Sequence, residues 1–141
     1  MSESGRKVVI VPCSGIGKTY GTVSREAAYE VVEELRSDET RLVALSLLVL
    51  GDPETRAAVA GSPAITIDGC KLACASKMVK ESGGAVVREF DVLEVYRRNK
   101  ELKPEGIASL NEDGERLARV LAEEVAATVD AARSQEEERD A

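Results

Sequence analysis

Two of the three cysteines of this chain, Cys70 and Cys74, lie in the segment 68–74, which reads DGCKLAC. A short apolar run, 64–67, precedes this segment, and residues with helical spacing follow it. At positions i and i+4 of a helix the two side chains would share one face, with Cβ atoms about 6 Å apart. That spacing suits two thiolates that bind one ion, whereas cysteines joined by a disulfide prefer Cβ atoms about 3.8 Å apart. The segment therefore indicates a metal site rather than a local disulfide.

The third cysteine, Cys13, follows a second apolar run, 8–11. If both runs are parallel strands of one sheet, their carboxyl ends lie at one edge, where α/β folds bind ligands. Thiolates favour zinc, and three protein ligands with an open fourth position are typical of reactive zinc sites. We therefore expect Cys13, Cys70 and Cys74 to bind one Zn²⁺. The fourth position would hold water, a small-molecule ligand or Asp68, which in the simpler interpretation only caps the helix.

Other interpretations of these residues stay open. Cysteines often pack as small apolar side chains without any chemistry. Cys13 facing Cys70 could form a reversible disulfide, so the chain could be a thiol redox enzyme, or one that transforms a small molecule through Cys13, Cys70 and Cys74. Residues 12–19 (PCSGIGKT) resemble a degenerate phosphate-binding loop in which Pro12 replaces the first glycine, with Lys18 for the phosphates.

The composition excludes several classes of function. The chain of 141 residues contains no histidine, so Ser-His-Asp and Cys-His catalysis and histidine metal ligands are excluded within it. A net charge of −7 with scattered basic residues argues against nucleic-acid and membrane partners. The longest apolar run, 42–50, is too short to span a bilayer, and residues 1–7 lack the apolar stretch of a signal peptide. We therefore expect a cytoplasmic protein, whose thiols stay reduced.

The elements that must position the cysteines alternate along the chain. Apolar runs predict strands, and helical periodicity or turn residues predict helices. Strands are predicted at 7–12, 64–67 and 85–90, and the run 42–50 predicts a strand that continues into a loop, although a buried helix turn would look alike there. The predicted helices are 22–36, 53–60, 70–81, 91–99 and 111–133. This order predicts an α/β fold: a mostly parallel, Rossmann-like sheet of about four strands flanked by helices, with a long C-terminal helix. We expect residues 1–133 to form one domain and 134–141 to be a charged, disordered tail.

Two motifs carry a resemblance to a known family. Residues 67–75 (IDGCKLACA) are similar to the signature of the DGC-domain family of zinc-binding proteins, and residues 11–15 (VPCSG) are similar to its first strand and loop. The resemblance covers about residues 7–130. It implies an α/β domain with a cysteine-bound metal, zinc, and no settled activity. Family members typically carry four cysteines, and this chain has Ala44 and Ile16 where further ones occur, so a closed four-thiolate site is not available.

Overall fold

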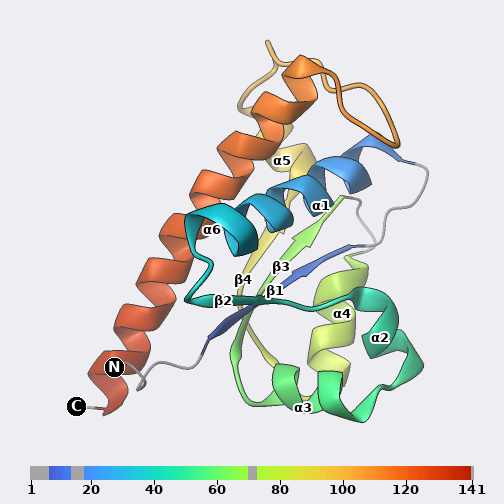
Figure 1. Ribbon diagram of the computed structural model, residues 1–141. Coiled ribbons are helices and arrows are strands. Elements are labelled where there is room, and N and C mark those ends of the chain that lie inside the picture. Colours follow the sequence, from blue (N-terminus) through green and yellow to red (C-terminus); the bar gives the residue numbers. More distant parts are fainter. Residues whose placement is uncertain (1–6, 14–17, 70–72, 141) are drawn as a thin grey trace.

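A four-stranded parallel sheet forms the centre of the protein. The computed structural model describes residues 7–13, 18–69 and 73–140, with side chains described as far as residue 135. The strand order is β2-β1-β3-β4, with β1 at Val8–Pro12, β2 at Thr40–Leu42, β3 at Pro63–Asp68 and β4 at Ala85–Asp91. Every pair of neighbouring strands is parallel, which confirms the predicted α/β architecture (Figure 1).

The register places the ends of β1 and β3 side by side. Val9 lies opposite Ala64, and Pro12 lies opposite Ile67. On the other side of β3, Asp68 lies opposite Asp91, the last residue of β4. The residues that follow β1, β3 and β4 therefore meet at one edge of the sheet, as expected for ligand sites in such folds.

The larger hydrophobic core lies between the sheet and four helical segments. These are α1 (Thr19–Glu30), the π-helical segment η2 (Val31–Leu35), α5 (Val92–Arg97) and α6 (Glu112–Asp140). Alternate residues of β1 and β3 point to this face, as the two-residue period of a strand requires. The fully buried side chains include Val8, Ile10, Ile65, Ile67, Val23, Val31, Leu117, Leu121, Val125 and Val129.

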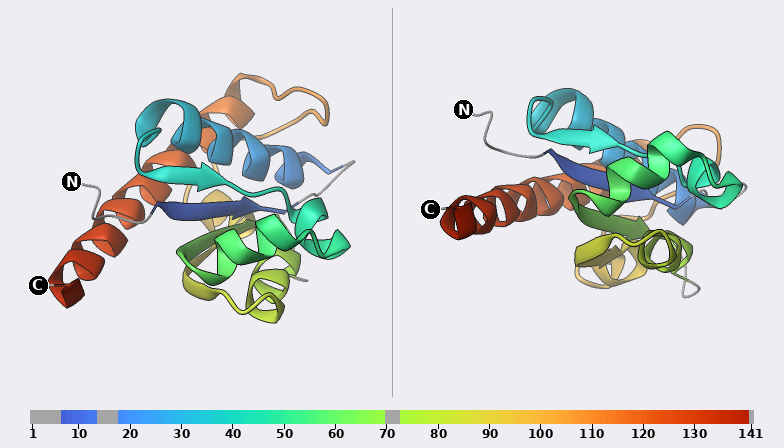
Figure 2. Two further views of the ribbon diagram at one scale, coloured as in Figure 1. Left: turned by 60° about the horizontal axis from the view of Figure 1, so that its bottom comes forward. Right: turned by 90° about the horizontal axis from the view of Figure 1, so that it is seen from below.

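A smaller core lies on the opposite face, beneath three short helices. They are α2 (Leu45–Leu50), α3 (Pro53–Ala60) and α4 (Cys74–Glu81). Figure 2, in its left view, shows α3 in front of the strands and α6 behind them. The buried side chains of this face are Val9, Val11, Val43, Leu45, Leu48, Val59, Ala64, Ala75 and Val79.

The run 42–50 is mostly helical rather than a strand that continues into a loop, so the alternative left open for it is the one present. The strand β2 ends at Leu42, and helix α2 occupies residues 45–50. Leu45 and Leu48, at helical spacing, are buried in the smaller core, and Gly51 ends the helix with a φ of 79°. A continuous apolar run has no period, so tertiary packing decided between strand and helix.

Three helix boundaries also differ from the predictions. Helix α1 begins at Thr19, earlier than residue 22, and α4 begins at Cys74, later than residue 70. Helix α6 continues to Asp140, past Arg133 where its apolar stripe ends, because glutamate and arginine are good helix formers. That residues 134–141 form a tail outside the domain stays a prediction. Among the described residues, no helix combines the length and apolarity needed to cross a membrane.

Candidate functional site

Cys13 lies directly after β1 and contacts the turn that follows β3. Its backbone N–H donates to the carbonyl of Ile67 at 2.8 Å, which extends the β1–β3 pairing by one residue. Its side chain is buried, and its Sγ accepts a hydrogen bond from the backbone N–H of Gly69 at 3.2 Å. The parallel pairing thus brings Cys13 to the segment 68–74, as the sequence predicts. A donated N–H favours the thiolate form of a cysteine over the thiol.

Gly69 packs against the backbone of the first turn of α1. A Cβ atom at this position would lie 2.9 Å from the carbonyl carbon of Tyr20 and 3.0 Å from the nitrogen of Gly21. A second contact joins the same elements, because the buried hydroxyl of Ser24 donates to the carbonyl of Ile67 at 2.8 Å. The turn that bears the cysteines is therefore held on α1, and only glycine fits at its closest point.

Asp68 holds the N-terminus of α4. Its Oδ1 accepts the backbone N–H of Ala75 at 2.9 Å, and its Oδ2 accepts the N–H and the hydroxyl of Ser76, each at 3.4 Å. The Ser76 hydroxyl also shares a 2.6 Å hydrogen bond with Thr66, which makes a buried polar network. Burial raises the pKa of the Asp68 carboxyl, and the hydrogen bonds from Ala75 and Ser76 oppose that rise. The capping role foreseen for Asp68 is thus present.

Cys74 is the first residue of α4 and is exposed. Ala73 precedes it in the left-handed region, with φ 51° and ψ 46°, a conformation that costs a non-glycine residue energy. Such strain persists only where neighbouring groups hold the backbone in place. Here the hydrogen bonds from Ala75 and Ser76 to Asp68 hold the residues that follow Ala73. Cys74 is therefore placed by a fixed backbone at the start of α4, and its exposed sulfur is accessible to a metal ion.

The three predicted sulfur ligands are not all within the described residues. Cys70 lies outside them, so its distance from Cys13 and Cys74 stays a prediction, as does the three-cysteine set itself. Within the described ranges, no group of three cysteine, aspartate or glutamate side chains is arranged to hold a metal. The donor chemistry at Cys13 and Cys74 fits a soft ion, because both residues offer sulfur, the ligand that zinc favours.

The predicted phosphate-binding loop, residues 12–19, is described only at its two ends. Residues 14–17 lie outside the described part of the chain. Pro12 is a buried residue of β1, and Lys18 is an exposed residue immediately before α1. The loop therefore joins a strand to a helix start, which is the setting that such loops require, and nucleotide binding stays untested.

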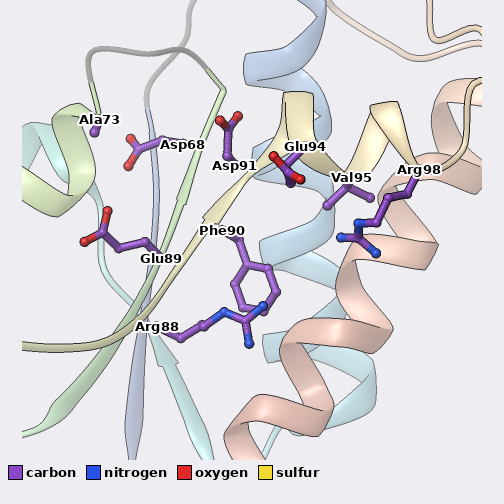
Figure 3. Close-up of a pocket in the computed structure, with 9 residues that line it drawn as sticks. All are labelled: Asp68, Ala73, Arg88, Glu89, Phe90, Asp91, Glu94, Val95 and Arg98. Atoms are coloured by element: carbon purple, nitrogen blue, oxygen red, sulfur yellow. The ribbon is translucent and has the colours of Figure 1, made fainter.

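A polar pocket that the sequence analysis missed lies beyond β3 and β4. It has a volume of about 340 Å³ and is lined by four carboxylates and two arginines, with Phe90 and Val95 between them. Figure 3 shows Asp68, Asp91 and Glu94 on one side of it, and Arg88 and Arg98 on the other. The signal was available: β3 and β4 both end in aspartate, and their ends are adjacent.

Two of these pocket side chains have structural roles. Asp91 caps α5 by accepting the N–H of Leu93 at 2.9 Å. The guanidinium of Arg98 is paired with Glu124 of α6 at 3.0 Å. The pocket is therefore built from groups that also hold α5 in place, and its four carboxylates outnumber its two arginines.

Comparison with known proteins identifies the family. The family model of the DGC domain matches residues 9–129. This range includes most of α6 and all four strands apart from the first residue of β1. The comparison with curated proteins found no match, and the comparison with solved structures found none either.

Proposed function

Because this chain belongs to the DGC domain family, we propose that it binds one zinc ion through Cys13, Cys70 and Cys74. The observation that carries the proposal is the hydrogen bond from the Gly69 N–H to the Cys13 Sγ, which joins the first cysteine to the turn bearing the other two. Sulfur ligands suit zinc, and three of them leave one position for water or a small molecule.

In this proposal Asp68 is a positioning residue rather than the fourth ligand. Both of its oxygens accept hydrogen bonds from the first turn of α4, so its carboxylate fixes where Cys74 lies. A metal ligand whose geometry is set by such a neighbour is typical of protein metal sites. In this proposal the zinc site senses or chemically transforms a small molecule that binds at the open fourth position of the metal.

The test measures zinc per chain by mass spectrometry on protein purified under reducing conditions and supplied with zinc. We expect about one zinc per chain in the unaltered protein. Cys13→Ser, Cys70→Ser and Cys74→Ser should each lower the zinc content strongly. A zinc content near zero in the unaltered, folded protein would overturn the proposal.

Asp68→Asn is the matched variant for the role of Asp68. Asparagine keeps one oxygen for the Ala75 N–H, so the variant should retain zinc near the unaltered level while its unfolding temperature falls. A folded Asp68→Asn protein that loses zinc as completely as Cys74→Ser would show that the carboxylate is a ligand. Cobalt substitution adds a readout, because thiolate-to-cobalt absorption should persist in Asp68→Asn and weaken in each cysteine variant.

The same preparations separate metal binding from thiol redox chemistry. Bound zinc should protect the thiols from alkylation until a chelator is added. A redox pair would instead lose two free thiols on mild oxidation, with or without chelator, and regain them on reduction. Titration with ATP and magnesium, with Lys18→Ala as the comparison, tests the phosphate-loop alternative.

A further inference from the structure

A second pocket lies beyond the carboxyl ends of β1 and β2, apart from the acidic pocket at β3 and β4. Its volume is about 360 Å³, within the range of small-molecule sites. It lies between α1 and the start of α2, and its wall includes Cys13, Arg25, Tyr29, Leu42, Ala44 and Leu45. A pocket of this size at the strand ends of a parallel sheet is the expected place for a ligand.

The wall of this pocket is mostly apolar, yet it is open to solvent. The side chains of Tyr29 and Leu42 are 37% and 38% exposed. Side chains of this size would be buried if they belonged to a hydrophobic core. Further along α2 the exposure rises, to 80% at Leu50. Partly exposed apolar side chains that line a pocket are typical of a ligand site.

One charged side chain makes the described lining of the pocket positive. Among its described lining residues Arg25 is basic and none is acidic, whereas four carboxylates line the pocket at β3 and β4. Arg25 and Tyr29 lie four residues apart on α1, so they share one face of that helix. The Arg25 Nη2 donates to the Thr22 hydroxyl at 3.2 Å, which keeps the guanidinium in place beside the apolar wall.

We propose that this pocket binds a small organic anion that has an apolar body and a terminal carboxylate. The apolar wall formed by Leu42, Ala44 and Leu45 takes the body, and the guanidinium of Arg25 takes the carboxylate. The net charge of −7 opposes the approach of an anion, so the attraction has to come from Arg25 at the pocket itself. The proposal does not depend on zinc, since none of these contacts uses a metal.

The probe is octanoate, and the matched neutral ligand is 1-octanol, which has the same chain without the charge. Binding is followed by calorimetry and by amide chemical shifts of the full-length protein. We expect saturable octanoate binding, shifts concentrated at residues 42–46, and octanol binding about tenfold weaker, because a charged hydrogen bond to Arg25 is lost. Absence of saturable octanoate binding to the folded protein would overturn the proposal.

Variants locate the contact. Arg25→Gln should weaken octanoate binding about tenfold and leave octanol unchanged, whereas Arg56→Gln, at an exposed position of α3, should change neither. Ala44→Trp should block both ligands by filling the pocket. Ala44 is exposed with extended backbone angles, so it accepts a larger side chain without unfolding the protein. Equal octanoate affinity in Arg25→Gln and Arg56→Gln would contradict the assignment of the carboxylate.

Sedimentation velocity of the same variants tests the other occupant of such a surface, a second copy of the chain. We expect the same sedimentation coefficient for the unaltered protein and Ala44→Trp. A dimer that Ala44→Trp dissociates would assign the apolar wall to self-association and overturn the proposal. We expect Arg25→Gln and Ala44→Trp to leave the zinc content unchanged. The outcome of the octanoate experiments is then independent of whether the proposed metal site exists.

Discussion

The two faces of the sheet are built differently. On one face α1 and the 29-residue helix α6 enclose 18 buried apolar side chains among the described residues. On the other face three helices of six to eight residues cover nine. Aspartate side chains cap the N-termini of two of these short helices: Asp52 accepts the Thr55 N–H of α3 at 3.0 Å, and Asp68 accepts the Ala75 N–H of α4 at 2.9 Å.

The difference shows how the protein separates stability from chemistry. A long helix with an apolar stripe along its length gains its stability from packing. A helix of two turns buries little, so a polar cap at its N-terminus matters more, and the cap of α4, Asp68, is the last residue of β3. Of the proposed metal ligands, Cys13 follows β1 and Cys74 begins α4, so a rigid sheet and a capped helix position these two sulfurs.

The largest effect should come from a cavity in the larger core. Leu121→Ala on α6 should lower the free energy of unfolding by about 4 kcal/mol, and Leu48→Ala on α2 by about 2 kcal/mol. Both leucines are fully buried, but a six-residue helix can move to fill the space and α6 cannot. Urea denaturation measures both values. Equal losses would show that the two faces are equally rigid and would break the comparison.

Gly69→Ala tests the joint between the two faces. The added Cβ would meet the backbone of Tyr20 and Gly21 at 2.9–3.0 Å, so we expect a loss of about 3 kcal/mol as α1 and the turn separate. Gly61→Ala is the matched control, because its Cβ would meet nothing closer than the Ala57 oxygen at 3.5 Å. Thermal unfolding followed by circular dichroism compares them. A Gly69→Ala protein as stable as Gly61→Ala would contradict the close contact.

Asp68→Asn tests the cap of α4 through its pH dependence. The pKa of Asp68 is raised above its ordinary value of 3.8, chiefly by burial, so the folded state holds the proton more strongly than the unfolded chain. Its contribution to stability is therefore complete below pH 3.8 and declines as pH rises through the folded-state pKa. The stability of Asp68→Asn relative to the unaltered protein should increase over that window. Denaturation at several pH values measures the free energy of unfolding of both proteins. Two curves of this free energy against pH that run parallel would contradict the prediction.

The smallest effect should come from the ion pair that fastens α6 to η2. Arg36 donates two hydrogen bonds of 2.8 Å to Asp130, and its hydrogen bond holds the pKa of Asp130 below the ordinary value. Asp130→Asn should cost about 0.5 kcal/mol at neutral pH, because both side chains are partly exposed.

The pH dependence of this pair has the opposite sign to that of Asp68. The contribution of Asp130 is present above its unfolded pKa and is lost as pH falls through the lower folded-state value. Glu94→Gln is the control, since its pair with Arg97 is longer, at 3.8 Å. As pH falls, the stability difference from the unaltered protein should change more for Asp130→Asn than for Glu94→Gln. Equal changes would mean that the ion pair with Arg36 does not stabilise the protein.

Local patterns in the sequence were enough to predict the fold class and the edge of the sheet where Cys13 lies. Strand and helix periods are local properties of the chain, and parallel strands joined by helices must share a carboxyl edge. These rules predicted that Cys13 lies close to the turn after β3, and its contact with Gly69 agrees with that prediction. The family was indicated separately, by the resemblance of the motif IDGCKLACA, and the match over residues 9–129 shows it.

Only the tertiary structure decided features that depend on residues distant in the chain. Residues 45–50 form a helix because Leu45 and Leu48 pack into a core made by other elements. Helix α4 starts at Cys74 rather than Cys70 because Asp68 accepts the N–H groups of residues 75 and 76. The two pockets, one acidic and one apolar, arise where ends of different strands meet, and no local period encodes which side chains face each other there.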